Sequence, residues 1–244
     1  MMFRTIMLAS TMLLAVGSAQ AALQITGSSG GSFSGLTSCD NSGFSQDCQI
    51  VATANGSNTQ VQWGSTNSSN FHNPSTLTSV DRSFNAPTTA NDLQLAQLTW
   101  FNSATNSDGN LASFGVAWNL SIAFTSPSVS SDTELFSLTI INPINPNPDS
   151  TSGFTLADLT GLTFSLAGVT ISDLKYGVTN STFVGNTWTN AENNTANLFI
   201  TADFTATPTG VPEPTSLALL GAGIIGTGAI ARRRRSSTTT PTAI

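Results

Sequence analysis

Two pairs of carboxylates are the residues whose chemistry could support catalysis. Asp132 lies two residues from Glu134, and Asp149 could meet Asp158 in space. Two acids on a jelly roll could act as general acid and base in glycoside hydrolysis. The only histidine, His72, lies in a polar loop, whereas a serine hydrolase or a zinc enzyme needs an imidazole with placed partners. We therefore predict no catalytic residue and keep a secreted glycan-active hydrolase as the alternative.

Oxygen ligands that suit calcium occur in two polar regions. Carboxylates and amide carbonyls are the hard ligands that Ca²⁺ prefers, and the candidates are Asp40, Asn41, Asp47, Asn147 and Asp149. No DxDxDG-type loop is present. We expect no cofactor, with calcium as the open alternative.

Sugar binding would use an exposed aromatic ring with amide or hydroxyl groups beside it. Trp188 has no apolar neighbour in the sequence, and Asn190 follows it closely. We predict Trp188 and Asn190 as candidate glycan contacts, with core packing as the alternative for Trp188. For the other tryptophans, core packing is the prediction: Trp63, Trp100 and Trp118.

The two cysteines of the chain, Cys39 and Cys48, lie in the part that we expect to be exported. An oxidising compartment favours their pairing, and the polar residues between them can turn the chain back. A metal site or two free thiols are the alternatives, and a structural disulfide is our prediction.

The first 21 residues have the design of a signal peptide. Arg4 precedes an apolar run, and Ala19 and Ala21 form a small-residue cleavage pattern. The run is too short for a transmembrane helix. We predict that signal peptidase cuts after Ala21.

The C-terminal end has a different design. Val211, Pro212, Glu213 and Pro214 precede an apolar stretch over residues 217–231. As a helix this stretch would rise about 22 Å, short of the roughly 30 Å hydrocarbon thickness of a membrane. Four arginines follow and should stay cytoplasmic: Arg232, Arg233, Arg234 and Arg235. We predict a marginal transmembrane helix in a transient inner-membrane intermediate.

The Pro-Glu-Pro motif, the apolar stretch and the arginine cluster together resemble the PEP-CTERM sorting signal of Gram-negative bacteria. The resemblance implies recognition of Pro212, Glu213 and Pro214 by an exosortase, a membrane-embedded cysteine peptidase, and loss of the tail. It also implies a host that makes exopolysaccharide. The expected locations are the cell surface, the outer membrane or the extracellular matrix.

Removal of both ends leaves an acidic domain. Only Arg82 and Lys175 remain of the seven basic residues, whereas only Glu213 leaves from the thirteen acidic ones. A phosphate-binding surface needs clustered Lys or Arg, so we expect no nucleic-acid partner.

The mature chain shows short apolar runs separated by turn residues, which is typical of an all-β protein. Phe114, Val116, Trp118, Leu120, Ile122 and Phe124 alternate with small or polar residues, a period that fits a strand and no helix. We predict a two-sheet antiparallel β-sandwich, jelly-roll-like. Further strands are expected at residues 61–63, 93–101, 134–140, 162–166, 169–171, 174–178 and 198–204, and one helical turn at 156–159.

The middle of the chain resembles a second family, the choice-of-anchor K ectodomains. The matching residues are 61–64, 95–102, 118–124 and 136–142. This resemblance implies a β-sandwich on the cell surface and brings no catalytic residue with it.

The predicted organisation has six parts. They are a signal peptide (1–21), a flexible Gly/Ser-rich leader (22–35), a β-sandwich ectodomain (36–206), a linker (207–210), the sorting signal (211–235) and a polar tail (236–244). We expect an exported, non-catalytic surface or biofilm-matrix protein that is processed by an exosortase and associates with exopolysaccharide or the envelope.

Overall fold

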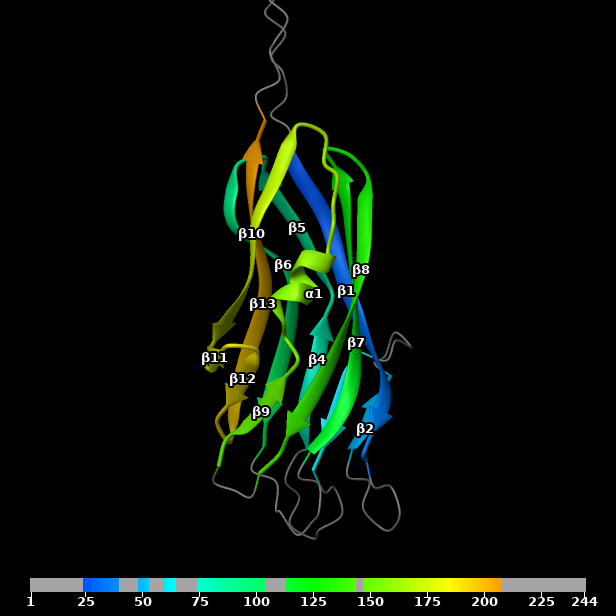
Figure 1. The fold of residues 1–244 in the computed structure, drawn as a ribbon, viewed down its shortest axis with the longest axis vertical. Coiled ribbons are helices and arrows are strands. Elements are labelled where there is room, and N and C mark those ends of the chain that lie inside the picture. The colour runs from blue at the N-terminus through cyan, green and yellow to red at the C-terminus, as the bar shows by residue number, and fades with distance from the viewer. Residues whose placement is uncertain are drawn as a thin grey trace, which may run out of the picture. The chain divides into compact units, whose positions relative to one another are not determined.

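The computed structural model describes residues 24–39, 48–52, 59–64, 74–103, 113–143 and 147–207. These residues form two antiparallel sheets that face each other (Figure 1). Sheet A has the spatial order β11 (Thr182–Val184), β12 (Thr187–Asn190), β9 (Asp149–Ser152), β8 (Ser130–Ile141), β7 (Ser113–Ser126), β1 (Gln24–Thr37) and β5 (Arg82–Pro87). Sheet B has the order β10 (Val169–Thr179), β13 (Asn194–Ala206), β6 (Ala90–Asn102), β4 (Ser75–Val80), β3 (Gln60–Trp63) and β2 (Cys48–Val51).

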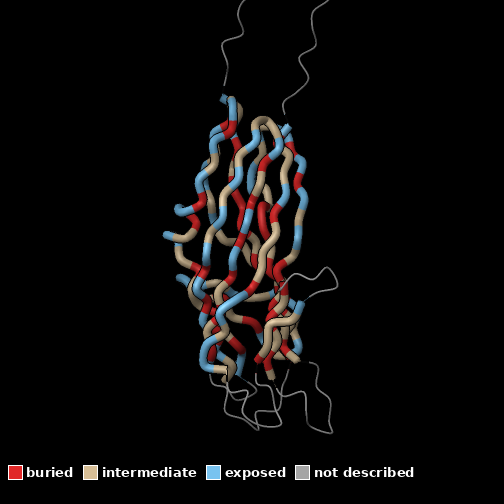
Figure 2. The backbone as a smooth tube through the Cα atoms, turned by 90° about the vertical axis from the view of Figure 1, so that its right-hand side faces the viewer, coloured by how far each residue is buried: buried red, intermediate tan, exposed pale blue. Residues whose placement is uncertain are grey.

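Alternating apolar side chains build the core between the sheets. The six apolar residues of β7 from Phe114 to Phe124 are each at most 3% exposed, and β8 pairs with β7 over its whole length. Buried and exposed residues alternate along the strands in Figure 2, as side chains on opposite faces of a strand must. The predicted all-β fold with two antiparallel sheets is confirmed, and the jelly-roll comparison stays a prediction.

The predicted flexible leader is wrong, because most of residues 22–35 lie in β1. This strand pairs with β5 on one side and with β7 on the other, so the folded domain reaches back to Gln24 and does not begin at residue 36. Its glycines have a packing role: a Cβ on Gly27 would collide with the carbonyl of Ala123, and one on Gly31 with the indole of Trp118. Small residues there allow close approach of neighbouring groups. The Gly/Ser-rich composition therefore reflects close packing and not flexibility.

The predicted strand at residues 162–166 is also wrong. Residues 162–166 form the irregular connection between α1 (Leu156–Gly161) and β10, although Leu162 and Leu166 are buried. These two leucines are buried because the connection covers the core, although it is not a strand of either sheet. In contrast, the runs at 169–171 and 174–178 belong to the single strand β10, which is interrupted by a register shift between Ser172 and Lys175.

The short helix α1 forms at the predicted turn. Thr155 caps it, since its hydroxyl accepts from the Asp158 amide at 3.2 Å and the Asp158 carboxylate accepts from the Thr155 amide at 3.0 Å. This reciprocal pair satisfies two otherwise free backbone donors. Leu159 is buried in the core.

The two processing segments lie outside the described residues. The predicted signal peptide, the sorting signal, its transmembrane helix and the polar tail are therefore not tested by the structure. Among the described residues, no helix combines the length and the apolar character needed to cross a membrane. Thr207, the first residue of the predicted linker, still donates its amide to Gly168 O at 2.8 Å.

The domain has two different ends. β1 begins and β13 finishes at the upper end in Figure 1. At the opposite end, which we call the lower end, β3 and β6 finish and β4, β9 and β13 begin. The side chains that form the candidate site lie at these strand ends.

Candidate functional site

A buried polar layer crosses the sandwich at the lower end. Ser75, Asn102 and Asn190 are each 0% exposed. The Ser75 hydroxyl donates to Asn102 Oδ1 at 3.2 Å, and Asn102 Nδ2 donates to Asn190 O at 3.0 Å. Asn190 Nδ2 in turn donates to Trp100 O at 3.2 Å. The layer thus joins β4 and β6 of sheet B to β12 of sheet A.

Asp149, the first residue of β9, lies in the same layer and is 0% exposed. Trp63 Nε1 donates to its Oδ2 at 3.1 Å. Burial raises the pKa of Asp149 to about 7, the hydrogen bond from Trp63 opposes this rise, and the charge of Glu192 adds to it. A raised pKa suits a general acid, but solvent does not reach this carboxyl group.

Glu192 lies in the turn between β12 and β13. Both of its carboxylate oxygens are shielded from solvent, and the Asn102 side chain lies within reach of them. Burial raises the pKa of Glu192, and the nearby Asn102 amide opposes that rise. Asp149 is paired with Asn190, two positions before Glu192, in the β9–β12 ladder, which explains how the two acids come to interact.

No basic side chain of the described residues neutralises these two acids. Lys175 pairs with Asp92 and Asp173. Arg82 donates to Gln97 and lies 5.9 Å from the ring centre of Phe199. Asp149 and Glu192 therefore form a carboxylate pair without a described counterion.

Asn142 follows β8 and contacts Asp149 through its amide. One terminal atom of this amide lies 3.1 Å from Asp149 Oδ1 and 3.3 Å from Oδ2. This atom is the amide nitrogen, which donates to the carboxylate.

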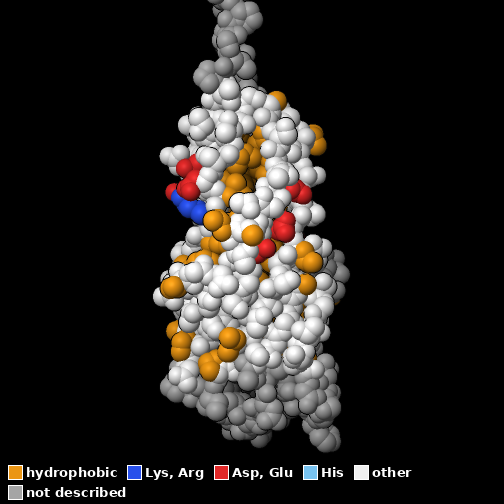
Figure 3. All heavy atoms as spheres, in the orientation of Figure 1, with side chains coloured by type: hydrophobic (Ala, Val, Ile, Leu, Met, Phe, Trp, Pro, Cys, Tyr) orange, Lys and Arg blue, Asp and Glu red, His pale blue; other side chains and the backbone are white. Residues whose placement is uncertain are grey.

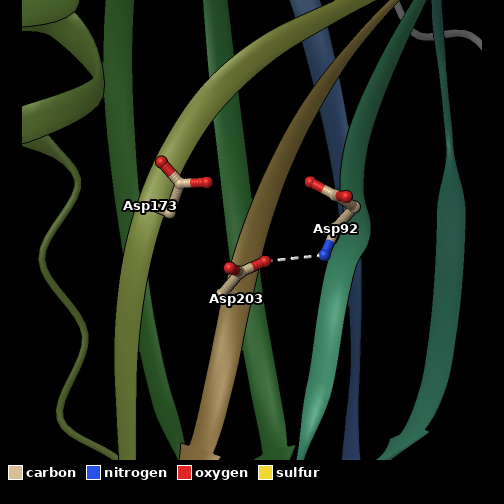
Figure 4. Close-up of side chains that lie close together, drawn as sticks. All are labelled: Asp92, Asp173 and Asp203. Carbon is tan, nitrogen blue, oxygen red and sulfur yellow. Dashed lines mark hydrogen bonds between the residues drawn. The ribbon is translucent and has the colours of Figure 1, made fainter.

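A second acidic cluster lies on the outer face of sheet B. Asp92, Asp173 and Asp203 come from β6, β10 and β13, and one ligand atom from each lies within 4.8 Å of the others. The Asp92 amide donates to Asp203 Oδ1 at 2.7 Å, as Figure 4 shows. Lys175 Nζ lies 2.7 Å from Asp92 Oδ1 and 2.6 Å from Asp173 Oδ2. The cluster thus already holds a cation from the chain itself.

This cluster depends on irregular backbone. Asp92 and Asp173 both have a φ of 51°, and register shifts lie beside Asp173 in β10 and beside Asp203 in β13. Bulges re-aim side chains, and here they accompany the meeting of three carboxylates. The hydrogen bonds that Lys175 donates to Asp173 and then to Asp92 raise the pKa of Lys175. The arrangement ties the edge strand β10 to β6 across β13.

Three of the four acids proposed for hydrolysis, Asp132, Asp149 and Asp158, have structural partners. Asp132 accepts from the amides of Thr163 and Thr133 at 2.7 and 2.8 Å. These backbone bonds lower the pKa of Asp132, the opposite of what a general acid needs. Asp158 caps α1, whereas Asp149 lies in the buried layer with Trp63.

The predicted glycan contact is wrong, because Trp188 and Asn190 are both 0% exposed. The Trp188 ring centre lies 5.1 Å from that of Trp100 and 6.2 Å from that of Phe154. Its Nε1 donates to Ser181 Oγ at 2.7 Å. The polar neighbours of Trp188 in the sequence reflect strand alternation and not solvent exposure. The other three tryptophans are core residues, as predicted.

The disulfide is confirmed. Cys39 and Cys48 are bonded, with a Cα–Cα distance of 5.7 Å. Cys39 follows β1 of sheet A and Cys48 begins β2 of sheet B, so the bond links the two sheets.

Replacement of both cysteines by serine should lower the free energy of unfolding by about 2 to 3 kcal/mol, the loop-entropy value for a ring of this size. Urea denaturation of the oxidised protein and of the variant measures the difference. Reduced wild-type protein is the control and should match the variant. Equal midpoints for all three samples would contradict the prediction.

Only two of the predicted calcium ligands, Asn147 and Asp149, lie among the described residues. Asp149 lies in the buried layer, and Asn147 precedes β9. Asp40, Asn41, Asp47 and the lone His72 lie outside the described residues.

The C-terminal segment decides how the protein is sorted. Residues 210–235 match the PEP-CTERM protein-sorting motif. The PEP-CTERM motif spans the predicted sorting residues from Val211 to Pro214 and the arginines from Arg232 to Arg235. It indicates an exported, cell-surface-directed protein that is processed by an exosortase. No curated protein matches the chain, and the resemblance to choice-of-anchor K ectodomains stays a prediction.

The PEP-CTERM motif was predicted from the sequence, but the interacting charged groups of the folded domain were not. Glu192 was not singled out because Asp149 lies far from it in the chain, and Lys175 was not because the cluster depends on the distant Asp92. The bulges at Asp92 and Asp173 carried no sequence signal that we recognised. The pairing of strands brings these charged residues together, and the sequence alone did not reveal that pairing.

Proposed function

We propose that this chain is a non-catalytic surface or matrix protein that associates with exopolysaccharide or envelope material after exosortase processing. The match to the PEP-CTERM motif at residues 210–235 is the observation that carries the proposal. Export and processing follow from the motif itself. The non-catalytic role and the polysaccharide are our inference.

The surface chemistry supports a hydrated extracellular setting. In Figure 3, uncharged polar groups cover most of the visible face of the domain, and charged side chains are few. Outside the two processing segments, acidic residues greatly outnumber basic ones. Such a surface remains soluble without attracting polyanions.

A hollow on the β1–β7–β8 side offers a place for sugar hydroxyls. It has a volume of about 330 Å³. Side chains of Asn119, Ser121 and Thr133 line it together with Gly30 and Gly31. Amide and hydroxyl groups can exchange hydrogen bonds with a polysaccharide chain. We place the weak polysaccharide contact here, because the aromatic contact at Trp188 is not accessible.

The bonding of the acids supports a role without catalysis. Asp132 and Asp158 bond to backbone amides of their own surroundings, and Asp149 is fully buried. A glycoside hydrolase needs two carboxyl groups that flank a bound sugar. Each pair predicted for that role contains at least one acid that is bonded to another group of the chain.

Deletion of residues 212–214 tests the sorting step. We expect wild-type protein from the host to have an intact mass that lacks the C-terminal tail and to fractionate with surface or matrix material. The deletion variant should keep its tail and stay with the inner membrane, because the exosortase has lost its recognition motif.

A Pro208→Ala variant is the matched control, since this proline lies outside the matched segment, and it should be processed normally. Enzymatic removal of exopolysaccharide should release the wild-type protein from the matrix fraction. A wild-type mass that includes the full tail would refute processing. Unchanged retention after polysaccharide removal would refute the polysaccharide association alone.

A further inference from the structure

The hollow on the β1–β7–β8 side lies on a face of sheet A that is nearly free of charge. β1 and β7 contain no charged residue. β8 contains two acids, Asp132 and Glu134, and both are paired with buried residues of β7. Because paired residues share a face of the sheet, both acids lie on the other face. Among the described residues that line the hollow, Asp81 is the charged one.

We propose that this hollow selects an uncharged polysaccharide, and that the Asp81 carboxylate accepts hydrogen bonds from its hydroxyl groups. The inference rests on the proposed association with exopolysaccharide and names the class of chain that is bound. A neutral chain brings hydroxyl donors to the carboxylate, which can only accept. A polyuronate or a sulfated chain brings like charges to it, and such a contact rejects the wrong partner.

The hollow forms where β5 leaves sheet A. β5 pairs with β1 from Gln24 to Ser29, and Ser29 lies opposite Arg82. From Gly30 onward, β1 has β7 as its one neighbour among the strands of sheet A. Asp81, the residue before β5, therefore lies at the corner where the pairing of β1 with β5 ends.

Gly30 allows the Asp81 carboxylate to lie against the backbone of β1. A Cβ on Gly30 would lie 2.7 Å from Asp81 Oδ1, which is too close for a real contact. Gly30 is paired with Ser121, and Ser121 is paired with Thr133. Both of these hydroxyl-bearing residues are exposed. The carboxylate thus lies at the end of a polar row that crosses β1, β7 and β8.

The Asp81 carboxylate is available to an external donor. Asp81 is exposed, and no hydrogen bond or ion pair joins its carboxylate to another described residue. Its neighbour Arg82 donates to Gln97 and lies against the ring of Phe199. Hydrogen bonds to an ionised acceptor are about twice as strong as those between neutral groups. Asp81 can therefore contribute more to binding than the hydroxyl and amide groups around it.

Host exopolysaccharide, separated on an anion exchanger into an uncharged and an anionic fraction, provides the probes. Affinity electrophoresis of the tail-processed wild-type protein should show clear retardation by the uncharged fraction and little by the anionic one. Asp81→Asn should weaken binding of the uncharged fraction by about five- to tenfold, because a neutral acceptor replaces an ionised one.

Asp92→Asn is the matched control, since it removes the same charge from the outer face of sheet B, and it should bind like the wild type. Retardation by the anionic fraction alone would overturn the selection of an uncharged chain while the association itself stands. Equal binding by the wild type and Asp81→Asn would do the same. Retardation by neither fraction would refute the association as well. If Asp81→Asn does not fold, the preference of the wild type between the two fractions decides.

Discussion

Replacement of Trp188 by alanine should lower the free energy of unfolding by about 3 to 5 kcal/mol, the range for a large aromatic side chain removed from a core. Trp188 is 0% exposed and contacts the rings of Trp100 and Phe154. The variant also leaves the Ser181 hydroxyl without its indole donor. Urea denaturation followed by circular dichroism measures the loss.

Val184→Ala is the matched control, because Val184 lies in the neighbouring strand β11 and is 77% exposed. Its unfolding free energy should stay within about 0.5 kcal/mol of the wild type. Polysaccharide retention by folded Trp188→Phe should equal that of the wild type, since the ring does not reach solvent. A Trp188→Ala loss below about 1 kcal/mol would contradict the buried position.

In the presence of a chelator, the protein should lose stability as the pH rises from about 4 to above 7. Burial raises the pKa of Asp149 to about 7, whereas an unfolded Asp titrates near 3.9. Between these values the unfolded chain binds fewer protons than the folded one, so the free energy of unfolding falls with pH. The full difference is about 4 kcal/mol. The raised pKa of Glu192 acts in the same direction.

Asp149→Asn removes this titration and should flatten most of the pH dependence above pH 4. Asp132 does not interfere, because its pKa is lowered and its contribution is lost only on further acidification. Urea midpoints at pH 4.5, 6 and 8 provide the measurement. A wild-type protein that is equally stable at all three values would show that Asp149 stays ionised in the fold.

Large alternating apolar residues were sufficient to predict the central strands. Apolar residues alternate over 114–124 in β7, 136–140 in β8 and 196–204 in β13, and these residues face inward. This regularity is a direct consequence of side chains alternating between the two faces of a strand. The same pattern predicted that Trp118 would lie in the core.

Strands made of small or polar residues escaped prediction for a physical reason. β1 consists largely of Gly and Ser, and its place in sheet A depends on close packing against Trp118 and β7. β12 holds Trp188 between two threonines, so the local composition resembled a surface loop. Tertiary pairing decides such segments, because their own propensity for strand is weak.

The two acids of the lower end, Asp149 and Glu192, were only half predictable from the sequence. Asp149 was among the calcium candidates because of its chemistry, but Glu192 was not. The pairing of β9 with β12 places the two acids near each other, and no spacing along the chain reveals that contact. The disulfide was easier to predict, since two exported cysteines have only one intramolecular pairing available.

The β10 edge of sheet B affects how neighbouring copies of the protein can associate at a cell surface. β10 is a long outer strand, and exposed strand edges invite other molecules to extend the sheet. Here Asp173 leaves the regular backbone geometry and Lys175 sits beside it with two acidic partners. An incoming strand would meet a distorted ladder and fixed charges, so this edge of sheet B is a poor template for the addition of strands from neighbouring copies.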